Sequence, residues 1–128
     1  MKRLGIVSAA IISVVMLATS AFAQDLNKGW DAYEAGDYAT ALQEFRPLAG
    51  QGNAYAQTNL GVMYDKGQGV LQDNVLAHMW YNLGAANGSK NGPKNRDSIA
   101  EEMTREDISK AQSMASECMS NDYKNCGY

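Results

Sequence analysis

Residues 60–88, LGVMYDKGQGVLQDNVLAHMWYNLGAANG, hold two helical patterns separated by a glycine-rich loop. In the second pattern, small and aromatic residues recur at intervals of three and four, which places them on one face of a helix. These residues are Ala77, Trp80, Tyr81, Gly84, Ala85 and Gly88. The first pattern places Gly61 beside Leu60 and Tyr64. Glycine inside a helix costs up to about 1 kcal/mol relative to alanine, so Gly61 indicates close packing against the second helix.

The pattern recurs on both sides of this stretch. Residues 37–52 align with residues 73–88 without a gap, at an offset of 36 residues. A weaker copy begins near Thr104, at an offset of 34 residues. Such a period is typical of helical repeat arrays, in which each unit buries its apolar face against its neighbours. The sequence therefore predicts an all-α fold, a short α-solenoid of about three antiparallel helix pairs.

Turn and capping residues set the expected helix boundaries. Gly36-Asp37 predicts a tight turn, and Gly67–Val70 predicts a longer loop. Asp73 is placed to cap the helix that follows this loop, and Thr104 begins a capping box. The six expected helices lie at about residues 25–35, 38–50, 53–65, 73–86, 93–102 and 105–119.

The first 23 residues have the pattern of a cleavable export signal. A basic start precedes the mostly apolar run Leu4–Ser20, and Ala21-Phe22-Ala23 has the small-x-small shape that signal peptidase recognises. An uncleaved membrane anchor is the alternative, but the apolar run is short for a membrane span. We expect cleavage after Ala23 and a mature chain, residues 24–128, that is periplasmic or secreted.

The charge balance disfavours two classes of partner. The chain has 11 basic and 14 acidic residues, and loss of Lys2 and Arg3 with the signal leaves 9 against 14, a net charge of −5. Nucleic acids and anionic membrane surfaces both require a basic face. The sequence therefore predicts no nucleic-acid partner and no membrane association after cleavage, and it assigns no oligomeric state.

The two cysteines, Cys118 and Cys126, lie at the end of the chain. Thiols of exported proteins usually pair, and a redox role would favour a tighter C-x-x-C spacing. We expect a structural disulfide that closes a loop of about nine residues and contributes about 2.5 kcal/mol. It would pin a tail, residues 121–128, to a helical repeat domain, residues 24–120.

No residue pattern predicts a catalytic or metal site. His78 is a lone histidine aligned with Leu42 in the preceding unit, and we expect it at the edge of a helix. Four acidic residues near the last helix lack the order of a calcium-binding loop, and they are expected to form a solvated face. They are Glu101, Glu102, Glu106 and Asp107. The sequence therefore predicts no catalytic residue, no metal and no cofactor.

Residues 60–88 resemble the Sel-1-like repeat, a relative of the tetratricopeptide repeat. The matching residues are Leu60-Gly61-x-x-Tyr64-x-x-Gly67-x-Gly69-Val70-x-x-Asp73-x-x-x-Ala77-x-x-Trp80-Tyr81-x-x-x-Ala85-x-x-Gly88. The first unit is more like a tetratricopeptide unit, and the third keeps only the spacing. The resemblance implies an all-α right-handed superhelix whose concave face binds a protein or peptide. It implies a non-enzymatic adaptor and names no particular partner.

The resemblance also implies which residues line the concave groove. In such arrays the first helix of each pair faces the groove, and counting from Gly61 gives the candidate positions. These are Trp30, Tyr55, Thr58, Val62, Asp65, Lys94, Asp97 and Glu101. Exposed tryptophan and tyrosine side chains are typical anchors for a partner.

One group of exported, cysteine-rich Sel-1-like proteins is associated with β-lactam binding or hydrolysis, which offers an alternative function. Such proteins carry a cysteine pair in each repeat, whereas this chain has one terminal pair. The chain also lacks the S-x-x-K motif of serine β-lactamases. A cell-wall or β-lactam-active protein is therefore the alternative hypothesis, and the sequence favours an adaptor over it.

Overall fold

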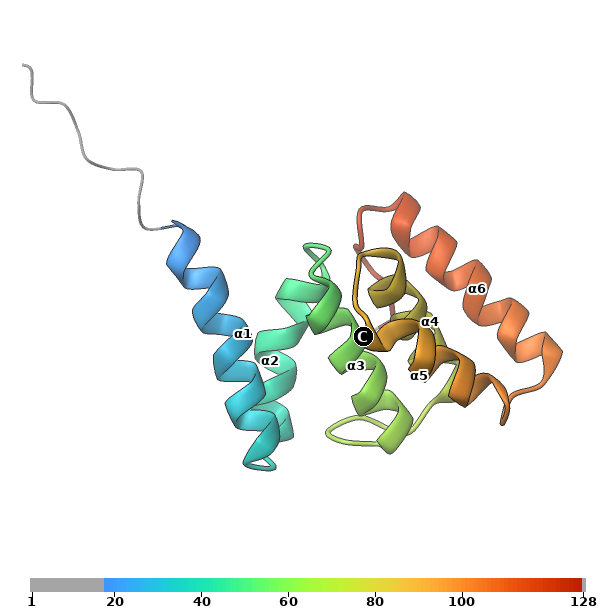
Figure 1. The fold of residues 1–128 in the computed structure, drawn as a ribbon, viewed down its shortest axis with the longest axis horizontal. Coiled ribbons are helices and arrows are strands. Elements are labelled where there is room, and N and C mark those ends of the chain that lie inside the picture. The colour runs from blue at the N-terminus through green and yellow to red at the C-terminus, as the bar shows by residue number, and fades with distance from the viewer. Residues whose placement is uncertain (1–17, 128) are drawn as a thin grey trace, which may run out of the picture.

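The computed structural model describes residues 18–127, and every regular element in this part of the chain is a helix. The six helices are α1 (Ala18–Glu34), α2 (Tyr38–Ala49), α3 (Ala54–Lys66), α4 (Asn74–Ala86), α5 (Asn91–Ala100) and α6 (Arg105–Ser120). They follow one another along the length of the molecule, so that α1 and α6 lie at opposite ends (Figure 1). This is the all-α, helical-repeat architecture that the sequence predicts.

The helix boundaries agree closely with the capping residues. The last five helices begin and end within two residues of the predicted positions. The side chain of Asp73 accepts a hydrogen bond from the backbone nitrogen of Leu76 at 3.0 Å. Thr104 does the same for Asp107 at 3.1 Å, so both predicted caps are confirmed.

Helix α1 begins seven residues before its predicted start. No glycine or proline lies between residues 18 and 24, so nothing there ends the helix. Residues 1–17 of the expected export signal lie outside the described residues. Cleavage after Ala23 therefore stays a prediction.

In each of the first two helix pairs, a glycine on one helix packs against an aromatic ring on the other. A Cβ atom on Gly61 of α3 would lie 2.5 Å from Cδ1 of the buried Tyr81 on α4. In the same way, a Cβ atom on Gly29 of α1 would lie 2.7 Å from Cε1 of Phe45 on α2. The missing side chain lets each helix pair approach closely around one aromatic ring. The prediction that Gly61 marks close packing is confirmed.

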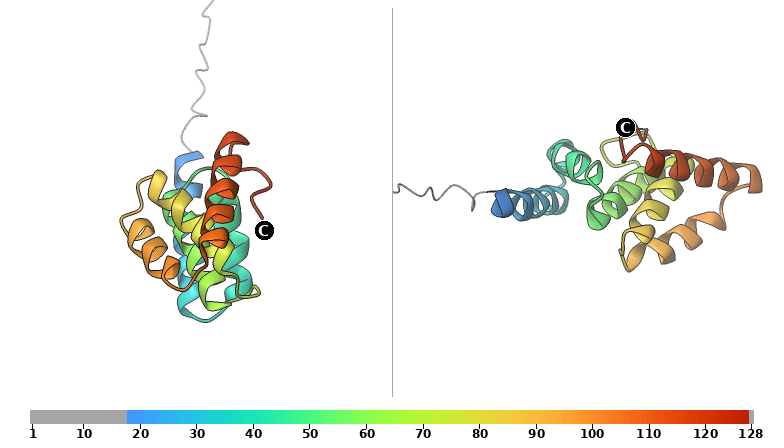
Figure 2. Two further views of the ribbon diagram at one scale, coloured as in Figure 1. Left: turned by 90° about the vertical axis from the view of Figure 1, so that its right-hand side faces the viewer. Right: turned by 90° about the horizontal axis from the view of Figure 1, so that it is seen from above.

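The third unit differs from the first two. Helices α5 and α6 both pack mainly on α4, and they make few contacts with each other (Figure 2). The reason is that α5 is short and polar, and it buries only Gly92 and Ile99. Helix α6 instead buries Ala111, Ala115 and Cys118. The centre of the core is consequently α4, whose Trp80, Tyr81 and Leu83 are fully buried.

Candidate binding groove

Two adjoining hollows lie among residues of α1, α3 and α5. The first, of about 290 Å³, is lined by Leu26, Asn27, Trp30, Tyr55, Asn59 and Asn91. The second, of about 300 Å³, is lined by Trp30, Tyr33, Thr58, Asn59, Val62, Lys66, Asn91 and Asn95. Both are bordered by Trp30, Asn59 and Asn91, so they form one surface, which we call the α1–α3–α5 groove.

The two exposed aromatic side chains of this groove are Trp30 and Tyr55, with 45% and 61% of their surface accessible. The ring of Trp30 stacks on that of Tyr33, with centroids 5.6 Å apart and planes at 20°. The Tyr33 hydroxyl donates a hydrogen bond to Gln68 Oε1 at 2.8 Å, and Gln68 Nε2 donates to the Tyr38 hydroxyl at 3.2 Å. The loop after α3 thereby fixes Tyr33, the ring on which Trp30 stacks. A positioned aromatic ring loses little conformational freedom when a partner binds.

Four of the eight predicted groove residues line this groove: Trp30, Tyr55, Thr58 and Val62. Thr58 does so from a buried position, where its hydroxyl donates a hydrogen bond to the carbonyl oxygen of Ala54 at 3.0 Å. The binding role of these residues stays a prediction.

The other four predicted residues border neither hollow. Asp65 is half-buried, and its Oδ2 accepts a hydrogen bond from the Tyr81 hydroxyl at 2.9 Å. Burial and this bond raise the pKa of Tyr81. Lys94 and Asp97 of α5 and Glu101, which follows α5, are exposed and border neither hollow. A contribution of these side chains to binding likewise stays a prediction.

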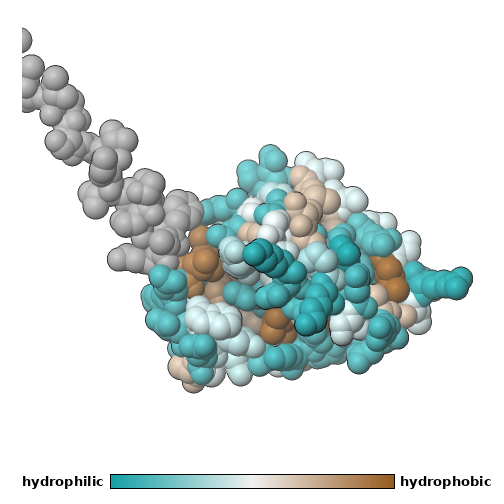
Figure 3. All heavy atoms as spheres, viewed as in Figure 1, coloured by the Kyte–Doolittle hydropathy of each residue, from teal (hydrophilic) through white to brown (hydrophobic). Residues whose placement is uncertain are grey.

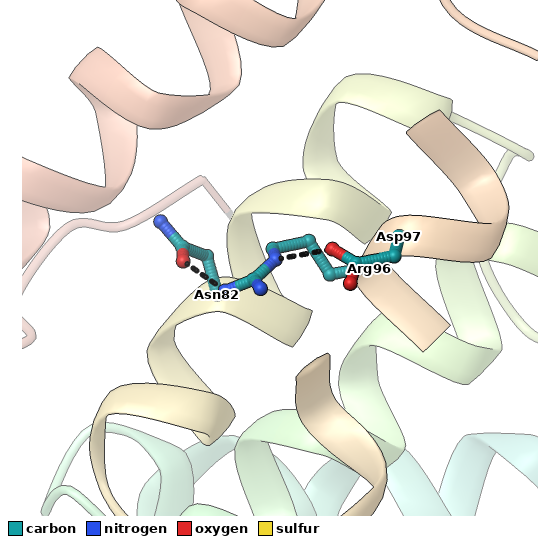
Figure 4. Close-up of polar contacts among 3 residues, drawn as sticks. All are labelled: Asn82, Arg96 and Asp97. Carbon is teal, nitrogen blue, oxygen red and sulfur yellow. Dashed lines mark hydrogen bonds and ion pairs between the residues drawn. The ribbon is translucent and has the colours of Figure 1, made fainter. Parts of the chain in front are cut away.

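The rotation of α5 follows from its contacts with α4. A Cβ atom on Gly92 would lie 2.6 Å from the backbone nitrogen of Ala85, so the start of α5 is pressed against α4. Arg96 Nη1 donates a hydrogen bond to Asn82 Oδ1 of α4 at 3.1 Å, and its Nε donates to Asp97 Oδ1 at 3.1 Å (Figure 4). These contacts, which repeat analogy does not reveal, decide which face of α5 borders the groove.

Sequence reasoning missed the four asparagines of the groove: Asn27, Asn59, Asn91 and Asn95. A sequence pattern could have pointed to two of them, because Asn27 and Asn59 occupy equivalent positions in the repeat. Each precedes a close-packing glycine, Gly29 or Gly61, by two residues. Asn91 and Asn95 are one helical turn apart on α5. No side chain of these four forms a hydrogen bond within the described part of the chain.

The expectation that His78 lies at a helix edge is wrong. Its side chain is only 2% exposed, because α4 packs against α3, α5 and α6. Among the described residues, its Nδ1 has no hydrogen-bond partner. Burial lowers the pKa of His78, and the positive charge of Arg96 lowers it further. His78 lines neither hollow of the groove.

The disulfide between Cys118 and Cys126 is present as predicted. The tail that follows α6 is also tied to the middle unit. The Tyr64 hydroxyl donates a hydrogen bond to the carbonyl oxygen of Gly127 at 3.2 Å, and that of Tyr123 donates to Asn87 Oδ1 at 3.1 Å. The disulfide therefore holds a segment that contacts both α3 and the end of α4.

The surface in the view of Figure 3 is mostly hydrophilic, with separate small hydrophobic patches. The acidic side chains 101, 102, 106 and 107 are all exposed. Within residues 18–127, no histidine, cysteine or acidic side chains are grouped to hold a metal ion. None of the helices in this range combines the length and apolar character needed to cross a bilayer.

Comparison with known families identifies one repeat. Residues 54–89 match the Sel1 repeat, and this segment contains α3, the glycine loop and α4. No curated protein and no solved structure matches the chain significantly. Sel1 repeats generally mediate contacts between proteins, and the match supports the resemblance found in the sequence.

Proposed function

We propose that the protein is an exported, non-enzymatic adaptor that binds a protein or peptide partner in the α1–α3–α5 groove. The observation that carries this proposal is the pair of exposed aromatic side chains, Trp30 and Tyr55, in one hollow. Aromatic anchors of this kind often supply most of the binding energy at protein interfaces. The Sel1 match at residues 54–89 supports a protein-binding role.

Two observations support export. The first 23 residues have the pattern of a cleavable signal, and Cys118 forms a disulfide with Cys126. Disulfides persist mainly in oxidising compartments such as the periplasm. Expression of residues 1–128 followed by N-terminal sequencing should give Gln24 as the first residue of the exported form. A chain that keeps its leader would contradict this part of the proposal.

Site-specific photo-cross-linking tests the groove. A photoreactive phenylalanine derivative is placed at Tyr55, and in a matched control at Leu71, which is 90% exposed but borders neither hollow. The exported chain is irradiated in intact cells, and adducts are separated by mass. We expect a discrete protein adduct from position 55 and none from position 71.

Competition separates specific from accidental adducts. Excess parent protein should suppress the adduct from position 55, whereas excess Trp30→Ala protein should suppress it much less. Adducts of equal yield from positions 55 and 71 would contradict a binding role for the groove. Hydrolysis of a chromogenic β-lactam by the purified chain would contradict the non-enzymatic part of the proposal.

A further inference from the structure

Another hollow, of about 210 Å³, lies beside the disulfide at the end of the chain. Four of the side chains that line it carry sulfur: Met79 of α4, Met114 and Cys118 of α6, and Cys126 of the tail. We call it the sulfur hollow. Among the described residues, none lines both this hollow and the α1–α3–α5 groove. The fold thus brings together sulfur-bearing side chains from three separate segments of the chain.

The sulfur hollow has the donor atoms of a soft-metal site. Thiolates and thioethers prefer Cu(I), whereas magnesium, calcium and manganese prefer carboxylate and carbonyl oxygen atoms. The exposed Glu117 is the one carboxylate among the described residues that line the hollow, and no histidine lines it there. Met79, Cys118 and Cys126 are at most 4% exposed, and Met114 is half-buried. A metal ion held by these residues would be largely shielded from water.

Only the dithiol form of the chain can supply thiolates. In the disulfide the two cysteine sulfurs are bonded to each other and carry no charge, whereas it is the thiolate that binds metals. Thiols stay reduced in the cytosol, so on the proposed export route the chain carries two thiols until an oxidant acts on it. A dithiol reductant restores this form. The bond between Sγ of Cys118 and Sγ of Cys126 breaks, the two sulfurs take up two electrons and two protons, and the reductant becomes a disulfide.

Hydrogen bonds hold the tail on the repeat without help from the disulfide. The Tyr64 hydroxyl donates to the carbonyl oxygen of Gly127 at 3.2 Å, and the backbone nitrogen of Tyr123 donates to the carbonyl oxygen of Cys118 at 2.9 Å. Because Tyr123 and Gly127 flank Cys126, we expect Cys126 to remain next to Cys118 after the S–S bond has broken. The Cα atoms of the two cysteines are 5.2 Å apart. Two metal–thiolate bonds, each about 2.3 Å long for zinc, require sulfur atoms within about 4.6 Å of each other, which rotation of the side chains provides.

We propose that the dithiol form binds one Cu(I) ion in the sulfur hollow. The thiolates of Cys118 and Cys126 are the principal ligands, and the thioethers of Met114 and Met79 complete the set. As the ion binds, the two thiols lose their protons to solvent. Copper keeps its oxidation state, so this step requires no electron donor or acceptor. The ion takes the place of the disulfide and links the tail to α6. This proposal goes beyond the adaptor function, since it concerns a different surface of the protein.

The test compares the reduced and oxidised forms of the full exported chain. Protein recovered from cells that express residues 1–128 is reduced with dithiothreitol and desalted under nitrogen, and its circular dichroism spectrum is recorded. Cu(I), maintained by ascorbate, is titrated in competition with bicinchoninate, a chromophoric Cu(I) chelator, and native mass spectrometry counts the bound ions. We expect one Cu(I) ion on the reduced chain and none on the oxidised chain. Excess Zn(II) should not displace the bound ion.

Variants test the thioether ligands. Met114→Leu keeps the approximate volume and the apolar character of the side chain but removes its sulfur, so the affinity for Cu(I) should fall by about tenfold or more. Met119→Leu is the matched control, because this residue also lies on α6 and is 39% exposed but does not line the hollow; its affinity should be unchanged. Replacing both cysteines by serine should abolish binding. The melting temperature of the reduced parent should rise on addition of Cu(I), because the ion binds the folded chain.

Four results would overturn the proposal. One is a reduced chain that keeps its helical spectrum and binds no Cu(I), and another is a reduced chain that loses this spectrum, because the site requires a tail held by its hydrogen bonds. Equal Cu(I) binding by the oxidised chain, or displacement of the ion by Zn(II), would show a different site or a different metal. Equal affinities of Met114→Leu, Met79→Leu and Met119→Leu would refute the sulfur hollow as the site. Photo-cross-linking at Tyr55 is independent of these results, so the copper site and the adaptor function can each fail alone.

Discussion

The contact between Gly61 and Tyr81 predicts that Gly61→Ala destabilises the protein, although alanine is the better helix former. A Cβ atom at position 61 would lie 2.5 Å from Cδ1 and 2.7 Å from Cε1 of the Tyr81 ring. The ring is 1% exposed, and its hydroxyl is held by Asp65 at 2.9 Å, so it has no room to move aside. Helices α3 and α4 must separate instead.

Two opposing effects set the change in the free energy of unfolding caused by Gly61→Ala. The gain in helix propensity is up to about 1 kcal/mol, whereas overpacking of a well-packed core costs about 1–3 kcal/mol. Because the Tyr81 ring is fixed, we expect a cost near the upper end and a net loss of about 1–2 kcal/mol in the free energy of unfolding. In a domain of this size, this corresponds to a fall of about 5–10 °C in melting temperature.

The assay is thermal unfolding followed by circular dichroism at 222 nm, with a double-mutant cycle as its control. In a Tyr81→Leu background the rigid ring is absent, so Gly61→Ala should be neutral or stabilising by up to about 1 kcal/mol. Gly61→Ala that is as stable as the parent in the presence of Tyr81 would refute the close approach of α3 and α4.

Three further predictions concern the core, the disulfide and the buried histidine. Tyr81→Ala should lower the free energy of unfolding by about 3–5 kcal/mol, whereas Tyr55→Ala should change it by less than about 1 kcal/mol and weaken partner binding. The reverse order in urea titrations would contradict the burial of Tyr81 and the exposure of Tyr55. Replacing Cys118 and Cys126 by serine should lower the free energy of unfolding by about 2–3 kcal/mol while preserving the helical circular dichroism spectrum. The reduced parent should melt like this variant. An oxidised parent that melts at the same temperature as the variant would contradict a structural role of the disulfide. Because the pKa of His78 is lowered in the folded state, its contribution to stability is present above about pH 6.5 and is lost as the pH falls through the folded pKa. The melting temperature should therefore fall from pH 7 to pH 5 more in the parent than in His78→Leu, and equal slopes would contradict the effect of burial.

The sequence by itself determined the helices and most of the core. Helix ends depend on neighbouring residues, and the capping side chains Asp73 and Thr104 act within three positions along the chain. The sequence also predicted close helix packing, because the repeat pattern places a glycine on one helix and an aromatic residue on the next, as with Gly61 and Tyr81. The disulfide followed from the count of two cysteines and the expected compartment.

The tertiary structure decided how the third unit is oriented and which residues border the groove. The repeat is irregular at α5, where Gly92 against Ala85 and Arg96 against Asn82 set the rotation of the helix. These contacts join residues of different helices, so no local pattern in the chain reveals them. The burial of His78 also depends on contacts between distant residues. Helix α4 packs against three other helices, whereas in a single helix pair the edge of α4 that carries His78 would be exposed. Helix formation is mostly local and readable from sequence, whereas the faces that helices turn to a groove depend on packing between distant residues.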